Sequence, residues 1–196
     1  MTRSIDLFYF VGSLYSYFAV MRAEPAARAA GLELRWRPFN VRAIMLEQDN
    51  LPRKKPVKMQ YTWRDIERRA RRLGLDFKPG VPLPVDADYL GNRVATVAAE
   101  EGSCADFSQR VFRAWFAEHK DPGEPGHLRA VLLSMGRDPE AVLARADSAE
   151  IRQRYDAQTD AARKLGIFGA PTFVVGGEIF WGFDRLDDAI DWARKT

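Results

Sequence analysis

Two serines, Ser13 and Ser16, lie at a junction in the chain where a hydroxyl group could hold an anion or a thiolate. Residues 5–11 before them are mostly apolar and aromatic, as in a strand buried on both faces. Residues 19–30 after them are rich in helix-forming Ala, Met, Arg and Glu. Gly12 between the two permits a tight turn. A strand that runs directly into a helix leaves free N–H groups and the positive end of the helix dipole at one point, which favours negative charge.

Ser13 also has a simpler interpretation, because serine is a preferred N-cap of a helix. The spacing of Ser13 and Ser16 is compatible with either role. The residues alone therefore leave open whether Ser13 caps a helix or acts on a bound ligand.

Composition excludes several classes of protein. The chain has 196 residues and a net charge of +3, from 30 Lys and Arg against 27 Asp and Glu, so charge alone does not indicate nucleic-acid binding. Because no run of about 18 apolar residues occurs and no signal-peptide pattern is found, we expect a cytoplasmic protein that does not bind membranes. The single cysteine, Cys104, cannot form an internal disulfide, which fits a reducing compartment. We expect no metal site.

The order of expected elements indicates the fold. Residues 32–39 alternate apolar and charged side chains and predict a second strand, parallel to the first because a helix connects them. Residues 172–175 and 178–181 predict a hairpin around two glycines, followed by a helix over 186–195 with Asp184 as its N-cap. Between these parts, the predicted helices cover residues 41–46, 59–73, 88–101, 106–120, 127–135, 139–145 and 148–165.

This order is the layout of an α/β chain with a thioredoxin-like fold and an inserted all-helical domain. We expect residues 1–40 and 166–196 to form the thioredoxin-like domain, and residues 41–165 to form the insertion. In that fold the junction carries a C-x-x-C motif, which here reads Ser13-Leu14-Tyr15-Ser16. Disulfide exchange is excluded because a serine cannot form a disulfide. Any thiol chemistry at this junction needs a thiol from a bound ligand.

Four motifs then resemble the 2-hydroxychromene-2-carboxylate isomerases and the related kappa-class glutathione transferases, within the DsbA-like group. The junction resembles the family motif S-P-x-S-Y-L-A, and Lys58, Tyr61 and Asp65 resemble K-x-x-Y-x-x-x-D. Residues 169–173 resemble G-[VA]-P-T-F, and residues 181–186 resemble W-G-x-D-R-L. The four motifs occur in order along nearly the whole chain, which makes the resemblance specific.

The resemblance implies a glutathione site. Ser13 matches the catalytic serine that hydrogen-bonds the glutathione sulfur. Ala170, which precedes the expected cis proline Pro171, matches the residue whose backbone pairs with the cysteinyl part of glutathione. Asp184 matches the carboxylate that meets the γ-glutamyl ammonium. The remaining matches to glutathione-binding positions are Asn50, Lys58 and Phe183. Taken without the resemblance, Asp184 reads as an N-cap, Asn50 as a turn residue and Lys58 as a solvated charge.

The resemblance also implies residues at an aromatic substrate. Asn92 and Arg93 resemble a polar pair near the substrate carboxylate, and Tyr15 and Tyr17 are expected to bind the substrate. The candidates to line an aromatic pocket are Phe10, Tyr15, Tyr17, Trp63 and Phe183.

The implied function is a glutathione-dependent isomerase that converts 2-hydroxychromene-2-carboxylate-like substrates to trans-o-hydroxybenzylidenepyruvate in naphthalene-type aromatic catabolism. We expect a homodimer that acts on a small aromatic carboxylate. Two alternatives stay open, a kappa-like glutathione transferase or peroxidase and a non-enzymatic DsbA-like binding module. A basic RNA-binding module is disfavoured, because acidic residues are interleaved with the arginines of the helix at residues 59–73.

Overall fold

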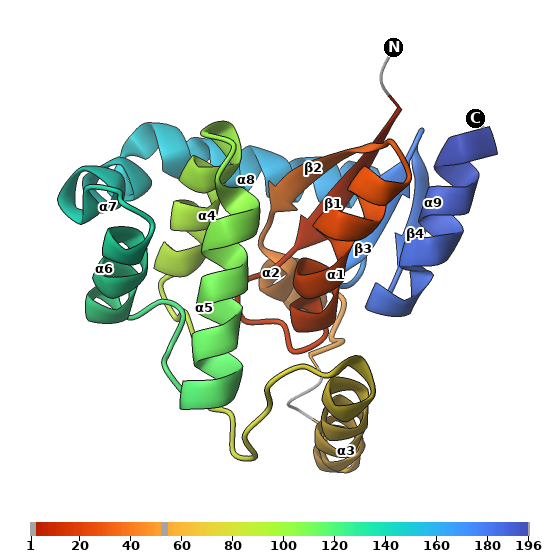
Figure 1. Ribbon diagram of the computed structural model, residues 1–196, viewed down its shortest axis with the longest axis horizontal. Coiled ribbons are helices and arrows are strands. Elements are labelled where there is room, and N and C mark those ends of the chain that lie inside the picture. Colours follow the sequence, from red (N-terminus) through yellow and green to blue (C-terminus); the bar gives the residue numbers. More distant parts are fainter. Residues whose placement is uncertain (1–2, 52–54, 196) are drawn as a thin grey trace.

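A four-stranded sheet forms the centre of the protein (Figure 1). The structure is a computed structural model and describes residues 3–51 and 55–195. The strands are β1 (Ser4–Tyr9), β2 (Glu33–Pro38), β3 (Thr172–Val175) and β4 (Glu178–Trp181), in the order β2-β1-β3-β4. Strand β1 pairs with β2 in parallel and with β3 in antiparallel orientation. The predicted strands and their pairing through a helical crossover are confirmed.

Strand β1 separates two groups of buried side chains because successive residues point to opposite faces. Ile5, Leu7 and Tyr9 belong to the main core with α1 (Ser16–Ala29) and α9 (Leu186–Lys195). Phe8 and Phe10 belong to a smaller cluster on the other face, which includes residues of α2 (Val41–Glu47) and α8 (Ala149–Lys164). The apolar run at residues 5–11 therefore contributes side chains to both clusters, as expected for a strand buried on both faces.

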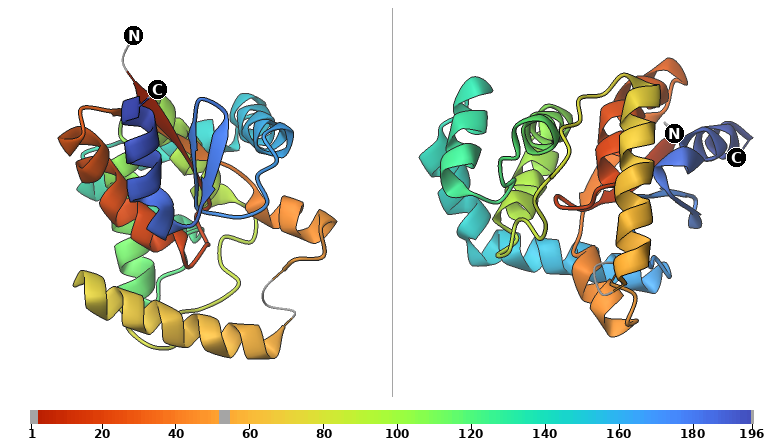
Figure 2. Two further views of the ribbon diagram at one scale, coloured as in Figure 1. Left: turned by 90° about the vertical axis from the view of Figure 1, so that its right-hand side faces the viewer. Right: turned by 90° about the horizontal axis from the view of Figure 1, so that it is seen from below.

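Helices make up most of residues 41–165. Besides α2 and α8 they are α3 (Pro56–Leu73), α4 (Leu90–Glu100), α5 (Cys104–Glu118), α6 (Pro125–Ser134) and α7 (Pro139–Asp147). Figure 2 shows α3 lying apart from the other helices, across the end of the molecule where β1 ends. Each of these helices was predicted, with ends that differ by up to three residues. The division of the chain into two domains stays a prediction.

The aromatic stripe of α5 is part of the core. Phe107, Phe112, Trp115 and Phe116 are fully buried within the chain, and the ring centroid of Phe116 lies 4.0 Å from that of Tyr17 on α1. The stripe therefore cannot also form the contact surface of a dimer. The predicted homodimer needs another surface and stays a prediction.

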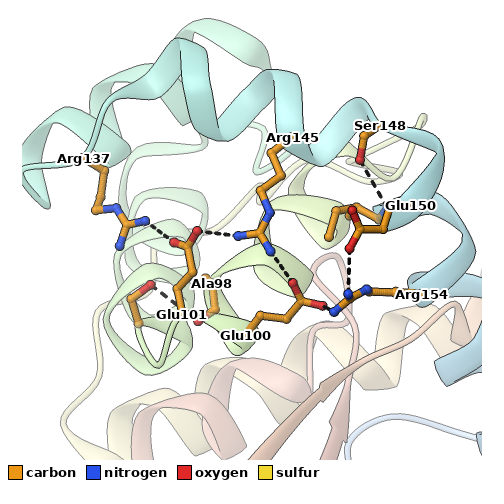
Figure 3. Close-up of polar contacts among 10 residues, drawn as sticks. Ala98, Glu100, Glu101, Arg137, Arg145, Ser148, Glu150 and Arg154 are labelled. Carbon is orange, nitrogen blue, oxygen red and sulfur yellow. Dashed lines mark hydrogen bonds and ion pairs between the residues drawn. The ribbon is translucent and has the colours of Figure 1, made fainter.

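Helices α4, α7 and α8 are joined on their outer face by ion pairs, shown in Figure 3. Arg145 of α7 lies 2.5 Å from carboxylate oxygens of both Glu100 and Glu101 at the end of α4. Arg137 pairs with Glu101, and Arg154 of α8 pairs with Glu100. We call these five residues the α4 ion cluster. Each of its charges is matched by protein groups.

The turn before α9 differs from the prediction. A short 3₁₀ helix, η2 (Phe183–Arg185), precedes α9, and the N-cap of η2 is Gly182. Asp184 lies inside η2 and accepts a hydrogen bond from Arg185 at 3.2 Å. The prediction that Asp184 caps α9 is therefore wrong, because the extra turn separates Asp184 from the first residues of that helix. In the described ranges, none of the helices has the length and hydropathy needed to span a membrane.

Candidate functional site

A cavity of about 550 Å³ lies between the end of β1 and helix α3. Its walls come from distant parts of the chain, namely the junction of β1 and α1, helices α2 and α3 with residues 50–51, residues 83–84, the loop before β3 and the turn after β4. The volume is that of a site for a small molecule or a cofactor. Residues distant in the sequence therefore meet at one place.

Ser13 lies at the centre of this arrangement. Gly12 before it has a φ of 122°, which allows the sharp turn out of β1. The Ser13 hydroxyl donates to the carbonyl of Ala170 at 3.2 Å, and its oxygen accepts the amide of Ser16, the first residue of α1, at 3.3 Å. The N-cap position itself is Tyr15, which makes no side-chain cap bond. Ser13 thus receives an amide at the start of α1 and also lines the cavity, so both of its predicted roles are compatible with its position.

The loop before β3 holds a cis peptide bond between Ala170 and Pro171, as predicted. The Pro171 carbonyl accepts the amide of Gly182 at 2.9 Å, and the Ala170 carbonyl accepts the Ser13 hydroxyl. These two bonds join the loop to the turn after β4 on one side and to the junction on the other. The Ser13 hydroxyl therefore lies beside a loop that hydrogen bonds hold to both neighbouring segments.

Every residue predicted to bind glutathione lines this cavity: Asn50, Lys58, Ala170, Pro171, Phe183 and Asp184. Lys58 projects from the first turns of α3, and Asp184 lies on η2. Both are exposed, so neither charge is buried by the protein. An ammonium and a carboxylate on the walls of one cavity suit a ligand that carries both signs of charge.

Tyr15 forms the side of the cavity together with α3. Its hydroxyl donates to the buried carboxylate of Asp65 at 3.0 Å, and its ring lies nearly parallel to that of Phe183, with centroids 6.1 Å apart. The guanidinium of Arg69 lies 5.2 Å from the Phe183 ring and 3.4 Å from Asp65. Burial, together with the Asp65 carboxylate, raises the pKa of the Tyr15 hydroxyl, which stays protonated at neutral pH.

The prediction that Asn92 and Arg93 bind the substrate is wrong in this structure, because both side chains are buried outside the cavity and bound to the protein. The Asn92 amide accepts from the Val11 N–H at 2.9 Å, and donates to the Val11 carbonyl at 2.8 Å and to Asp86 at 2.6 Å. Arg93 donates to the carbonyl of Ala146 at 2.9 Å and pairs with Asp147 at 3.0 Å. Neither residue lines the cavity.

Asp86 was not foreseen in the sequence, and it completes this buried group. Its carboxylate accepts the amides of Gly91 at 2.9 Å and Asn92 at 3.0 Å. Burial raises the pKa of the Asp86 carboxyl, and these hydrogen bonds oppose the rise. The group thus fixes the start of α4 to the end of β1.

Two of the five aromatic candidates also lie elsewhere. Tyr17 is fully buried on the core side of α1, and its hydroxyl donates to the carbonyl of Asp76 at 2.9 Å. Trp63 is partly buried against the main core and does not line the cavity. The prediction of substrate contact is therefore corrected for both residues. Phe10, Tyr15 and Phe183 do line the cavity.

Sequence reasoning missed several residues of the cavity wall. Arg42, Met45, Leu51, Leu83 and Arg69 line it, and the peptide bond between Leu83 and Pro84 is cis. A proline-rich loop at residues 77–84 and a basic residue in the first turn of a helix after β2 were visible signals. They became informative only when the fold brought these segments to Ser13.

The cavity fits glutathione in the chemistry of its walls. The exposed Asp184 carboxylate pairs with Arg185 and has further acceptor positions for an ammonium group, while Lys58 and Asn50 offer donors to carboxylates. The Ser13 hydroxyl and the start of α1 are groups that favour a thiolate over a neutral thiol. Ser13 and the six residues predicted to bind glutathione already line the cavity in this structure.

Comparisons with known proteins show which proteins this chain resembles. Residues 4–191 match the DSBA-like thioredoxin domain. The 2-hydroxychromene-2-carboxylate isomerase of Pseudomonas putida is 29% identical over 188 residues, which cover 93% of this chain and 90% of that protein. Glutathione s-transferase kappa 2 of Caenorhabditis elegans is 23% identical over 212 residues, covering 98% of this chain and 92% of that protein.

A solved structure of a 2-hydroxychromene-2-carboxylate isomerase superposes with a TM-score of 0.82 at 27% identity. The superposition covers 98% of this chain and 95% of that one. The predicted fold, a thioredoxin-like α/β fold with inserted helices, is thereby confirmed. The chain belongs to the family of DSBA-like thioredoxin domains.

Proposed function

We propose that the protein is a glutathione-dependent isomerase that converts 2-hydroxychromene-2-carboxylate or a closely similar aromatic carboxylate to its trans-alkene isomer. Family relatives with this activity, similar over nearly the whole chain, support the reaction class. A pathway that degrades aromatic hydrocarbons is the corresponding context.

One observation carries the proposal. Seven residues assigned to glutathione from the sequence lie on one cavity, although they come from four separate parts of the chain. They are Ser13, Asn50, Lys58, Ala170, Pro171, Phe183 and Asp184. The fold alone does not require a lysine ammonium, a carboxylate and a serine hydroxyl to line the same cavity as the cis proline.

Glutathione, when bound, supplies a thiol whose reversible addition to a conjugated carbon turns a double bond into a single bond, so that the ring can open, rotation can occur about that bond, and elimination returns the thiol and the trans alkene. The contribution of this chain is electrostatic. The Ser13 hydroxyl turns from the Ala170 carbonyl, 3.2 Å away, toward the sulfur and donates a hydrogen bond to it. The start of α1 adds its dipole, and both favour the ionised thiol.

The remaining residues position the reactants. Asp184 and Lys58 bind the charged ends of glutathione, and Ala170 pairs with its backbone as an added strand would. Phe10, Tyr15 and Phe183 provide flat apolar surfaces for the aromatic substrate and exclude water from it. Ser13 forms no covalent bond in this scheme.

A kappa-like glutathione transferase is the second candidate, favoured by the similarity to the Caenorhabditis elegans protein. It needs the same glutathione site and differs in that the thiol stays attached to the product. Turnover of a generic electrophile such as 1-chloro-2,4-dinitrobenzene, without turnover of 2-hydroxychromene-2-carboxylate, would favour this alternative. A non-enzymatic binding module would bind no glutathione.

Calorimetry with glutathione tests the shared site first. The wild type is expected to bind glutathione, and Asp184→Ala is expected to lose about 10- to 100-fold in affinity, as for the removal of a charged hydrogen-bond partner. Asp187→Ala is the matched control, because Asp187 is an exposed carboxylate on α9 outside the cavity. Absence of binding at millimolar glutathione would overturn the proposal. If glutathione binds, an assay for conversion of the chromene substrate in its presence distinguishes an isomerase from a transferase.

A further inference from the structure

Arg42 stands out at the end of the cavity next to α2. The wall there is formed by apolar side chains, among them Phe10, Val41, Met45 and Leu83. Arg42, in the first turn of α2, is the charged residue among them. The proposed function assigns it no role, since the sequence had assigned the substrate carboxylate to Asn92 and Arg93.

The Arg42 guanidinium is held in place by neutral groups. Its carbon lies 5.0 Å from the centre of the Phe10 ring and 5.4 Å from that of the Tyr89 ring. One nitrogen donates to the carbonyl of Val85 at 2.9 Å. The side chain is half-buried, so its position is set before a ligand arrives.

The other arginines of the cavity differ from Arg42 in their partners. Arg69 pairs with Asp65 at 3.4 Å, and Arg185 pairs with Asp184 at 3.2 Å. Within residues 3–51 and 55–195, no carboxylate lies within ion-pair distance of Arg42. Among the described residues its charge is therefore matched by no anion, and most of its five N–H donors have no partner there.

A half-buried guanidinium beside aromatic rings and apolar walls fits a planar aromatic ligand that carries a carboxylate. The guanidinium binds a carboxylate through two parallel hydrogen bonds, and the apolar wall covers the ring system. The carbonyl of Phe10 accepts the amide of Ser13 at 3.0 Å, so the ring beneath Arg42 and the serine at the sulfur position belong to one turn. A ligand anchored at Arg42 therefore lies next to the reacting position.

We propose that Arg42 binds the carboxylate of the aromatic substrate and makes the enzyme specific for aromatic carboxylates. The inference rests on the proposed function, which it deepens by naming the residue that recognises the substrate anion. Arg42 takes the place that the sequence had given to Arg93.

Binding of two unreactive probes tests this role without turnover. The probes are chromone-2-carboxylate and chromone, which share the bicyclic ring and differ in the carboxylate. Calorimetry in the absence of glutathione is expected to show that the wild type binds the carboxylate more tightly, by about 10- to 100-fold. Arg42→Met is expected to remove this preference and to leave chromone binding unchanged. Arg42→Lys is expected to restore part of it, because a lysine offers a point charge without the two-bond geometry.

Arg163→Met is the matched control, because it removes a cation that pairs with Glu47 of α2 outside the cavity. Equal loss of both probes in Arg42→Met, an unchanged preference for the carboxylate in that variant, or the lack of such a preference in the wild type would overturn the inference. Thermal unfolding confirms that each variant is folded. Glutathione calorimetry on the same proteins keeps the two proposals apart, since the inference requires Arg42→Met to bind glutathione as the wild type does.

Discussion

The start of α4 and the wall of the cavity both carry an asparagine and an arginine, but the two regions use them differently. At the start of α4, Asn92 and Arg93 have protein partners for their polar atoms and are almost completely buried. At the cavity, Arg42 rests on two aromatic rings, and Asn50 lines the open space. Residue type is thus a poor guide to function unless the partners of each polar group are known.

The difference has a physical cause. A buried polar group costs free energy unless its hydrogen bonds are made within the protein, so Asn92 and Arg93 stabilise the fold. A cation at an open cavity keeps some contact with water and can exchange that water for a ligand anion. Charges that the protein leaves unmatched, as at Arg42, are accordingly the ones to test for binding.

The largest expected effect comes from Ser13, one of the two serines of the junction. Ser13→Ala is expected to lower kcat/KM for the glutathione-dependent reaction by about 100- to 1,000-fold, as when one preorganised donor to a developing charge is removed. Ser16→Ala is the control, because the buried Ser16 hydroxyl has no hydrogen-bond partner among the described residues. Similar losses in both variants would indicate that the junction acts through helix stability and not through the Ser13 hydroxyl.

Replacing each of the two asparagines, Asn92 and Asn50, by leucine tests the comparison between the two regions directly. Asn92→Leu is expected to lower the free energy of unfolding by about 3 kcal/mol, because the Val11 amide and the Asp86 carboxylate lose a buried partner. Asn50→Leu is expected to change stability by less than about 0.5 kcal/mol and to weaken glutathione binding. Urea unfolding and calorimetry measure the two quantities. A stable Asn92→Leu variant with a raised KM for the substrate would restore the original assignment of Asn92.

The α4 ion cluster is expected to give the smallest effect. Arg145→Met removes the contacts with Glu100 and Glu101, yet the side chains are near the surface, so the loss of stability should be about 0.5 to 1 kcal/mol at low salt. The loss should shrink further at about 0.5 M salt, where exposed charges are screened. Glutathione affinity should stay at the wild-type value. A change in that affinity would show that the helical layer influences the cavity.

Periodicity in the sequence was sufficient to predict the strands and helices, and motif resemblance was sufficient to name seven residues that line one cavity. Both signals are local or depend on short motifs in a fixed order. The cis proline at residue 171 belongs to the second kind. These predictions needed no knowledge of which side chains touch one another.

The residues expected to bind the aromatic substrate could not be predicted in the same way. The partner of Asn92 is Val11, which is 81 residues away in the chain, and the rings that hold Arg42 belong to Phe10 and Tyr89. Helical spacing shows which face of α1 is buried, but it does not distinguish a face packed on α5, as for Tyr17, from a face on a cavity. Asp184 was misassigned as the N-cap of α9 because an aspartate shortly before a helical pattern suggests a cap. The sequence pattern is the same whether or not a 3₁₀ turn precedes the helix.

The strand order has a consequence for newly made chains. Strand β1 lies in the middle of the sheet, yet one of its neighbours, β3, begins only at Thr172. During synthesis on the ribosome, one edge of β1 stays unpaired until residues 172–175 have been made. Its apolar side chains are exposed to other chains during that time, so this protein should depend on chaperones or on fast synthesis to avoid aggregation.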